Sequence, residues 1–418
     1  MAVKLSRRRF AQMLPLGLAL PLNVSLGASP SAFNFRIRTI TAGLNMTGKT
    51  WIGEAERAAG FLRGARQAFA AQGYEVQTLR IATRAFSDYH ANWTSPVARR
   101  TIKALDEFAQ DQNLMLSIGP VISADTYHPE FADWAVELLR ETSNISFSLN
   151  MASDLGGVHH RGLRSAADAI LAIAHGTPGG EGNFRFAANA FTPAGTPFFP
   201  AAYFDRGRAF SIGLESPNLL AAAFRQASSV VEAKTILAQQ LNDALDPVAV
   251  LASSLAEKQG WSYLGIDTSP APGLDSSIGA AIETLTGAPF GSTSTLSACA
   301  AITSVLQNLD VLSCGYSGLM LPIMEDPVLA RRAREGRYGI SELLLYSSVC
   351  GTGLDVVPIP GDSSSTTVAN ILSDVASLAA RYRKPLSARL FPAPGKHAGD
   401  MVSFDNPHLT PAVVMSTA

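Results

Sequence analysis

The sequence predicts an α/β fold with parallel strands in one large unit. Residues 35–41 alternate apolar and polar side chains, as a half-buried strand does. Residues 53–72 then place apolar side chains at three- and four-residue intervals, which is typical of an amphipathic helix, and residues 74–81 alternate again. Strand, helix and strand in this order favour a parallel sheet that is covered by helices.

The same alternation continues to the end of the chain. Further strands are expected at residues 114–119, 145–149 and 356–359. Helices are expected at 96–110, 129–142, 164–174, 219–259 with a break near Asp246-Pro247, 276–285, 295–309, 326–335, 340–350 and 364–382. No repeat or low-complexity linker divides residues 33–418, so we expect a single α/β domain.

The composition indicates a large buried core and excludes several classes of protein. Hydrophobic residues make up 47% of the 418 residues and charged residues 16%, and the formal net charge is −1. This balance gives no support to nucleic-acid binding. Apolar runs beyond the N-terminus are too short for a spanning helix, so no permanent membrane anchor is expected. Three cysteines without a Cys-x-x-Cys pair do not form a disulfide framework.

The N-terminus matches a twin-arginine export signal. Residues 6–10 read Ser-Arg-Arg-Arg-Phe, and a modest apolar stretch follows over residues 11–26. We expect a removable signal peptide over residues 1–32, cleaved after Ala28 or at a later site up to Ala32. The twin-arginine export machinery is then a partner, and the mature protein is periplasmic or extracellular. The alternative is an uncleaved basic, apolar leader.

A small-residue loop precedes one of the predicted helices. Ser292, Thr293, Ser294 and Thr295 follow Gly291 directly ahead of an apolar helical run. Backbone N–H groups at a helix start can hold a carboxylate or phosphate, so this loop is a candidate anion site. The alternative is an ordinary helix cap, because serine and threonine are common capping residues.

A second loop, residues 392–400, gathers several functional side-chain types. Gly395, Lys396, His397 and Asp400 combine a permissive glycine with a cation, an imidazole and a carboxylate. The spacing is not that of a phosphate-binding P-loop. A ligand-binding loop, with Lys396 acting in catalysis, and a structural turn both fit this sequence.

Cys350 is a candidate nucleophile at the end of a predicted helix. A thiol there can attack a substrate if a base such as His397 lies within hydrogen-bonding reach. The alternative is a small buried side chain, which is the ordinary environment of a lone cysteine.

Acidic residues near predicted junctions of strands and helices supply further candidates. Asp275 and Asp355 could act in acid–base chemistry, and Asp326 and Asp362 could hold a divalent cation. Glu215 and Asp267 belong to the same set, and for each acid a helix cap or a turn is the alternative. The histidines have no zinc-site spacing.

The ordered motifs of the mature chain resemble the domain of unknown function 711 (DUF711) family, and the first strand also resembles that of the family. The match extends from about Phe35 to the C-terminus. The motifs that carry it are residues 186–189, 195–203, 210–217, 315–318, 353–362 and 392–400. Within the last motif, His397 stands where the family has a second lysine, while Lys396 and Asp400 fit the pattern.

The resemblance implies a large α/β barrel similar to that of pyruvate formate-lyase and other glycyl-radical enzymes. The radical itself is not implied, because the C-terminal part has no Arg-Val-x-Gly-Tyr loop and Cys299, Cys314 and Cys350 include no adjacent pair.

We expect an exported enzyme that acts on a small, anionic metabolite inside the barrel by acid–base or metal-assisted chemistry. A non-catalytic periplasmic ligand-binding protein is the alternative. The sequence does not determine the oligomeric state, and a homo-oligomer is one option.

Overall fold

The computed structural model describes residues 34–46 and 51–417. The signal peptide predicted for residues 1–32 therefore lies outside the described residues. The strands are β1 Arg36–Leu44, β2 Val76–Thr83, β3 Met115–Ile122, β4 Ile145–Ser153, β5 Gly157–Val158, β6 Phe186–Ala190, β7 Ala209–Glu215, β8 Ser262–Pro270, β9 Gly353–Pro360, β10 Leu386–Ala393, β11 Met401–Val402 and β12 Ala412–Val413. These strands and the helices between them confirm the predicted α/β class.

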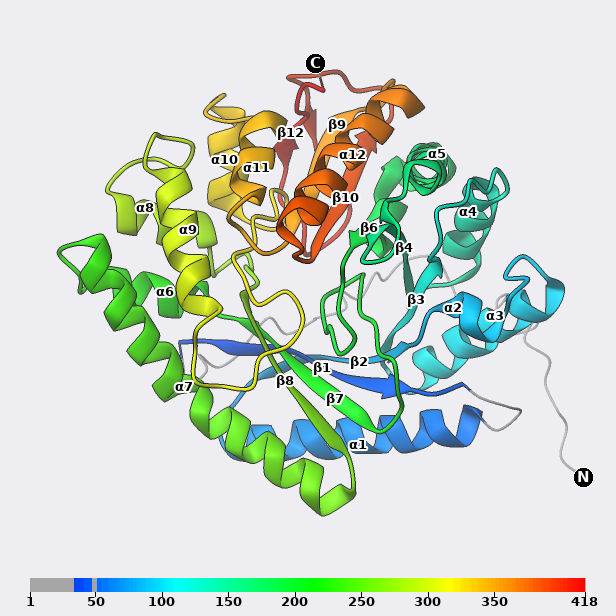
Figure 1. Ribbon diagram of the computed structural model, residues 1–418, viewed down its shortest axis with the longest axis horizontal. Helices are drawn as coiled ribbons and strands as arrows, with labels where there is room; N and C mark the ends of the chain where they lie inside the picture. Colours follow the sequence, from blue (N-terminus) through cyan, green and yellow to red (C-terminus); the bar gives the residue numbers. More distant parts are fainter. Residues whose placement is uncertain (1–33, 47–50, 418) are drawn as a thin grey trace, which may run out of the picture.

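The helices lie outside the sheet, as Figure 1 shows. They are α1 Trp51–Ala71, α2 Phe86–Tyr89, α3 Pro96–Asp111, α4 Phe131–Glu141, α5 His160–Gly176, the 3-10 helix η2 Pro178–Arg185, α6 Pro217–Phe224, α7 Val230–Gln259, α8 Ile278–Thr286, α9 Thr295–Leu306, α10 Pro327–Arg334, α11 Ile340–Ser347 and α12 Ser365–Tyr382. No helix of the described part of the chain is both long and apolar enough to cross a membrane.

The large sheet forms a barrel from two groups of parallel strands. Its order is β8-β7-β1-β2-β3-β4-β6-β10-β9, with β5 added to β4. The two groups meet antiparallel where β1 pairs with β7 and where β6 pairs with β10. Single parallel bridges join Ser313 to Ile266 of β8 and Pro322 to Asp355 of β9. The segment 313–322 therefore lies between the two edge strands and closes the barrel.

Side chains alternate between the two faces of the barrel wall. In β7, Phe210, Ile212 and Leu214 belong to the main hydrophobic core, which includes buried residues of the surrounding helices. The alternation of a strand places Ser211 and Glu215 on the opposite face, and both are buried. In β10 the main core takes Leu386, Ala388 and Leu390, which leaves Arg389 on the inner face. The interior of the barrel is therefore unusually polar for a protein core.

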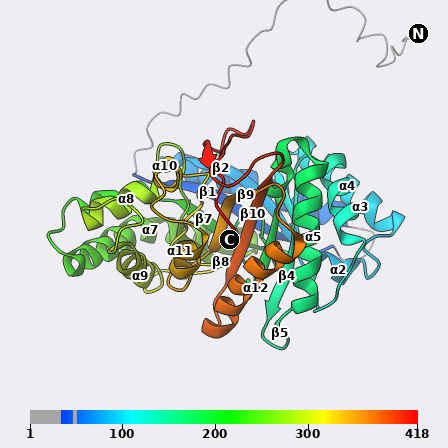
Figure 2. The ribbon, with the colours of Figure 1, turned by 90° about the horizontal axis from the view of Figure 1, so that it is seen from above.

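Helices of the two strand groups also meet on the outside of the barrel. Helix α12 packs beside α5, as both views show (Figure 1, Figure 2). Ser365 at the start of α12 donates a hydrogen bond of 2.5 Å to Asp168 of α5, and Asp168 also accepts one from Tyr127 at 3.1 Å. These contacts join the two groups near the pairing of β6 with β10.

A hairpin-like segment, residues 193–204, occupies part of the barrel interior. Thr196 pairs with Tyr203 in an antiparallel bridge, and the backbone N–H of Phe204 donates to the carbonyl of Thr83 at 3.1 Å. Ser117 of β3 donates to the carbonyl of Ala202 at 2.8 Å. These bonds hold the segment against β2 and β3, so its aromatic side chains have fixed positions next to the interior charges.

The helix predicted over residues 219–259 is two helices, and the predicted break near Asp246-Pro247 is wrong. α6 ends at Phe224 and α7 begins at Val230, whereas Pro247 lies inside α7. Ser229 caps α7 by accepting a hydrogen bond of 3.2 Å from the backbone N–H of Glu232. This Ser-x-x-Glu spacing is a common helix start, and here it determines the boundary more strongly than the proline does.

The C-terminal segment covers one end of the barrel. Val402, Leu409 and Val414 pack with Phe391 of β10 and Met324 in a small separate hydrophobic cluster. The backbone N–H of Thr410 donates to the carbonyl of Met324 at 2.7 Å. This packing places His408, which precedes Leu409 in the sequence, near the buried charges that the next subsection describes.

Candidate functional site

Five charged side chains form one network at the interior face of the barrel. We call Arg38 of β1, Glu215 of β7, Glu325, Asp355 of β9 and Arg389 of β10 the interior charge cluster. Arg389 contacts Asp355 through Nε and Oδ1, and its Nη2 lies 2.9 Å from Oε1 of Glu325. Arg38 Nη2 lies 4.0 Å from Glu325 Oε2, and Arg38 Nη1 lies 3.1 Å from Glu215 Oε2. Residues far apart in sequence are thereby connected.

The network continues to the rim of the barrel through Arg36. Arg36 Nη1 lies 2.5 Å from Glu215 Oε1, and its Nη2 lies 2.6 Å from Asp275 Oδ2. The Asp275 side chain is 64% exposed, while that of Glu215 is 2% exposed. The charges therefore lead from the solvent at Asp275 to the completely buried Asp355.

Asp355 and Arg389 form an ion pair in which one atom of each remains unpaired. Burial raises the pKa of Asp355, although Arg389 opposes this rise. Burial also lowers the pKa of Arg389, but Asp355 and Glu325 outweigh that effect and raise it above its ordinary value. Among the described residues, Asp355 Oδ2 and Arg389 Nη1 have no hydrogen-bond partner although both atoms are buried. One guanidinium is thus shared between two carboxylates, and Asp355 holds its proton more tightly than an exposed aspartate does.

Arg80 of β2 is a second buried guanidinium, and no carboxylate in the described part of the chain lies within ion-pair distance of it. It is 5% exposed. Its Nη1 donates to the carbonyl of Pro197, and its Nε has no partner. Burial, with a smaller contribution from the nearby Arg38, lowers the pKa of Arg80 to about 9. An unpaired buried cation is costly, so this position favours an anion.

Aromatic rings connect the two buried guanidinium groups. Arg389 Cζ lies 5.6 Å from the ring centre of Phe184 and 5.5 Å from that of Phe198. Arg80 Cζ lies 5.4 Å from the ring centre of Phe199, which is 5.2 Å from the ring centre of Phe184. Both cations therefore face one aromatic group, and cation–π attraction offsets part of the cost of their burial.

His408 stands on the outer side of this aromatic group. Its ring is stacked on that of Phe184, with the centres 6.5 Å apart and an angle of 5° between the planes. The side chain reaches the surface. Burial of its inner part, followed by the charge of Arg38, lowers the pKa of His408. His408 is therefore mainly neutral at neutral pH and lies between the solvent and the cluster.

The structure brings two of the four predicted catalytic residues, Asp355 and Asp275, into this connected network. Cys350 lies elsewhere. It is 1% exposed within the main hydrophobic core, and its carbonyl accepts a hydrogen bond of 2.7 Å from Lys384. This environment is that of a small buried side chain, and the exposed His397 is not among its contacts.

Asp326, a predicted metal ligand, caps two helices. Its carboxylate accepts hydrogen bonds from the backbone N–H groups of Val328 at 2.9 Å and Leu329 at 3.0 Å. The hydroxyl of Ser277 and the N–H of Ile278 donate to it at 2.8 and 2.7 Å. These donors use both carboxylate oxygens, so the carboxylate joins the starts of α8 and α10.

Asp362, the other predicted metal ligand, is exposed and makes no hydrogen bond or ion pair with the groups that surround Asp326. Its Oδ2 is 3.4 Å from Nδ1 of His397. Within residues 34–46 and 51–417, no three histidine, cysteine, aspartate or glutamate side chains are grouped as a metal site requires.

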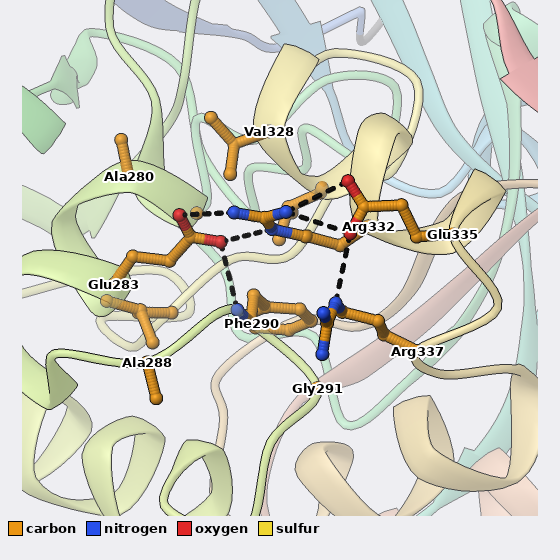
Figure 3. A network of polar contacts seen from close by, with 12 residues as sticks. Ala280, Glu283, Ala288, Phe290, Gly291, Val328, Arg332, Glu335 and Arg337 are labelled. Atoms are coloured by element: carbon orange, nitrogen blue, oxygen red, sulfur yellow. Dashed lines mark hydrogen bonds and ion pairs between the residues drawn. The ribbon is translucent and has the colours of Figure 1, made fainter.

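The loop predicted to bind an anion at residues 291–295 lies beside cations that are already paired. Figure 3 shows Arg332 between Glu283 and Glu335, with Arg337 also bound to Glu335. Glu283 accepts a hydrogen bond of 2.9 Å from the backbone N–H of Phe290, directly before the loop.

Within the loop, Thr295 accepts a hydrogen bond of 3.0 Å from the N–H of Gly291. Ser294 stands at the start of α9 without a side-chain cap bond, and Ser292 and Thr293 lie between it and Gly291. Gly291 and Thr295 thus bond within the loop, whereas Ser294, the N-cap residue of α9, does not cap the helix with its side chain as the structural alternative expected.

Of the loop predicted at residues 392–400, the first two residues are the buried end of β10, and residues 394–400 form an exposed turn. The backbone N–H of His397 donates to Asp400 Oδ2 at 2.8 Å, and the N–H of Asp400 returns a bond of 3.0 Å to the carbonyl of His397. Gly395 and Lys396 are exposed in the same turn. The structure does not bring Lys396 to Asp355.

An open cavity of about 380 Å³ lies at the other end of the barrel, beside Asp205, Arg206 and Cys314. Arg206 precedes β7, whereas Glu215 of the interior charge cluster ends that strand. Burial raises the pKa of Cys314 well above its ordinary value, so this thiol is not activated at neutral pH. We therefore place the candidate site at the cluster, where buried charges converge.

Six residues of the site were not predicted from the sequence: Arg36, Arg38, Arg80, Arg389, Glu325 and His408. A charged residue at an inward position of an apolar strand is the signal that could have revealed them. Arg80 lies between Leu79 and Ile81, and Arg389 lies between Ala388 and Leu390. Because buried arginines require a counter-charge, such positions predict a polar interior.

The sequence of this chain is similar to a family of proteins from bacteria and archaea. The family model described as Uncharacterised ACR (DUF711) matches residues 31–406. A UPF0210 protein of Pyrobaculum aerophilum is 31% identical over 281 residues, which cover 63% of this chain and 60% of the relative. A UPF0210 protein of Desulfovibrio desulfuricans is 26% identical over 331 residues, which cover 73% of this chain and 72% of the relative. The chain spans about 60% of the length of the Pyrobaculum relatives that it matches.

Proposed function

This chain belongs to the DUF711 family, and from that premise and the interior charge cluster we propose that it is an enzyme acting on a small, anionic metabolite. Arg80, with Arg38 beside it, would hold the anion, and Asp355 would exchange a proton with the bound molecule. The observation that carries the proposal is the buried guanidinium of Arg80, whose Nε has no partner among the described residues and which is joined through two aromatic rings to an ion pair with unpaired atoms.

The chemistry of the cluster supports acid–base catalysis more than passive binding. A purely structural ion pair favours full satisfaction of its hydrogen bonds, whereas Asp355 Oδ2 is buried without a partner. Burial raises the pKa of Asp355, which brings a carboxyl closer to the range in which it can both accept and donate a proton. Arg389 remains charged and fixes the orientation of that carboxyl through Oδ1.

Metabolite profiling with a matched pair of variants tests the proposal. Purified protein is incubated with periplasmic extract, and mass spectrometry follows consumed, formed and retained compounds. We expect the wild type and the control His397→Ala to convert one anionic metabolite, because His397 is exposed and outside the cluster. Asp355→Asn should lose this conversion. A retained ligand without any product would instead favour the non-catalytic binding protein, and conversion unchanged in Asp355→Asn would reject the proposed site.

We also propose that the protein is exported through the twin-arginine route, which its N-terminal residues support. Residues 6–10 carry the expected arginines, and a short apolar stretch follows. Exchanging Arg7 and Arg8 for lysine should leave the protein in the cytoplasm, as cell fractionation would show. Continued export of that variant would reject the proposal.

We further propose that the barrel is related to that of pyruvate formate-lyase but works without its radical. The closed barrel supports the first part, and the missing Arg-Val-x-Gly-Tyr loop supports the second. Electron paramagnetic resonance of anaerobically prepared protein should show no glycyl radical, and such a signal would contradict this.

A further inference from the structure

The open cavity of about 380 Å³ at the other end of the barrel has the size and the position of a ligand site. Pockets for small ligands commonly enclose roughly 300–1,000 Å³. Arg206, which lines the cavity, lies against Gly43 near the end of β1, where a Cβ would collide with the Arg206 carbonyl oxygen. Because β1 to β4 and β6 are parallel, their carboxyl ends share this end of the barrel. Ligands of α/β folds bind at such ends.

One wall of the cavity is fixed by a buried carboxylate. Asp267, which is 4% exposed, accepts hydrogen bonds of 3.0 Å from the backbone N–H groups of Tyr316 and Ser317. Gly315 has a φ of 65°, and a Cβ there would collide with Asp267. The Ser317 hydroxyl donates to the carbonyl of Cys314 at 2.8 Å. This wall is therefore preformed, and its main hydrogen bonds are already made within the chain.

The charged residues of the cavity lining are a single ion pair, Asp205 and Arg206. Arg206 donates from Nε to Asp205 Oδ1 at 2.8 Å and from Nη2 to Oδ2 at 3.0 Å. The side chain of Asp205 is 43% exposed and that of Arg206 is 61% exposed. Arg206 Nη1 makes no hydrogen bond to the described part of the chain, and each carboxylate oxygen can accept a second bond. The pair can therefore bind a cation and an anion side by side without breaking.

We propose that this cavity binds a small zwitterion of the α-amino acid class, with its carboxylate on Arg206 and its ammonium group on Asp205. The two charges of such a ligand are on neighbouring groups, which matches the adjacent charges of the ion pair. A simple anion would be repelled by Asp205, and a simple cation by Arg206. Leu264, Pro193 and Ala194 add an apolar side to the lining. At about 30 Å³ per water molecule, the cavity has room for about a dozen waters and hence for an amino acid.

Calorimetry with the whole protein tests this charge pattern, independently of the reaction proposed for the interior charge cluster. The probes are free alanine, serine and leucine, the amide of each, which keeps only the ammonium charge, and the N-acetyl derivative of each, which keeps only the carboxylate. For at least one of the three, we expect the free amino acid to bind on the order of tenfold more tightly than either derivative, as one charge-assisted hydrogen bond implies. The proposal is overturned if none binds at millimolar concentration, or if a derivative of every binder binds equally well.

Cys314 reports whether the amino acid occupies this cavity. Its residue belongs to the lining, whereas Cys299 and Cys350 are 0% and 1% exposed within the main hydrophobic core. At about ten times its dissociation constant, the amino acid should slow alkylation of Cys314 by iodoacetamide about tenfold, because about a tenth of the molecules are then free. Peptide mass spectrometry would measure this rate in alkaline buffer. Unchanged alkylation would place the ligand elsewhere and overturn the site.

Two variants separate the two charges. Arg206→Gln should reduce the affinity for the amino acid to that for its amide, because the carboxylate loses its partner. Asp205→Asn should reduce it to that for the N-acetyl derivative. Both variants should fold, since an exposed ion pair contributes little to stability. Arg383→Gln is the matched control, because it breaks the exposed ion pair with Asp154, outside the cavity, and should bind like the wild type. An undiminished preference for the free amino acid in both cavity variants would overturn the proposal.

Discussion

Replacing Arg80 with methionine should stabilise the ligand-free protein while it weakens the binding of the small anion proposed as its ligand. The two effects have opposite signs because Arg80 is a buried cation without a carboxylate partner. Methionine has a similar length and no charge, so it can fill the same space among the aromatic rings.

The magnitude follows from the environment of the guanidinium. Burial lowers the pKa of Arg80 to about 9, and at about 1.4 kcal/mol per tenfold change this corresponds to roughly 5 kcal/mol of penalty on the charged form. The variant loses the hydrogen bond to Pro197, worth about 1.5 kcal/mol, and the contact with Phe199, worth about 1 kcal/mol. The net gain in the free energy of unfolding is therefore about 2–3 kcal/mol.

Urea denaturation monitored by circular dichroism measures this gain as a higher midpoint at an unchanged slope. Arg66→Met is the matched control, because Arg66 also has a buried Nε without a partner among the described residues but lies on α1. A loss of more than about 2 kcal/mol in Arg80→Met, with anion binding unaltered, would show that the charge of Arg80 serves the fold and would refute the reasoning.

Three further predictions concern other parts of the molecule. Because burial raises the pKa of Asp355, its contribution to stability is fully present below the unfolded pKa of about 4 and is lost as the pH rises through the folded value. The wild type should therefore gain stability relative to Asp355→Asn when denaturation is measured at falling pH, and a constant difference would contradict this. Arg332→Met should lower the free energy of unfolding, as urea denaturation would measure, because it removes the ion pairs with Glu283 and Glu335. Burial acts to raise the pKa of Glu283, but its hydrogen bond from Arg332 outweighs burial and the pKa is lowered. The loss of stability in Arg332→Met should therefore shrink in acid, where Glu283 becomes protonated, and a larger loss in acid would reject the assigned ion pair. Cys350→Ala should lower stability by about 1 kcal/mol without changing turnover, and loss of turnover in the folded variant would restore Cys350 as a nucleophile.

Five of the strands could be predicted from the sequence, whereas β6 and β7 were missed. Residues 35–41 and 74–81 alternate visibly and correspond to β1 and β2. Residues 114–119, 145–149 and 356–359 correspond to β3, β4 and β9, so nearly complete burial does not prevent such a prediction. β6 is short and rich in alanine and shows neither pattern, whereas β7 does alternate large apolar with small or polar residues and was missed all the same.

The acids of the site could be foreseen as candidates, but their partners could not. Asp355, Asp275 and Glu215 attract attention as carboxylates near predicted strand ends. Arg389 pairs with Glu325 across 64 positions of sequence, and no local pattern announces that contact. The predicted loops at 291–295 and 392–400 have side chains suited to anions, yet the structure uses many of their polar groups in local hydrogen bonds. Residue types indicated the chemistry, whereas only the closure of the barrel brings the charges together.

The most direct test of the account is the rate at which Asp355→Asn consumes the anionic metabolite that the wild type converts. General acid–base catalysis contributes a factor of about 10²–10⁴, so we predict a fall of at least about 100-fold in that rate while the variant remains folded. Equal rates for the wild type and Asp355→Asn would contradict the claim that the interior charge cluster is the catalytic site.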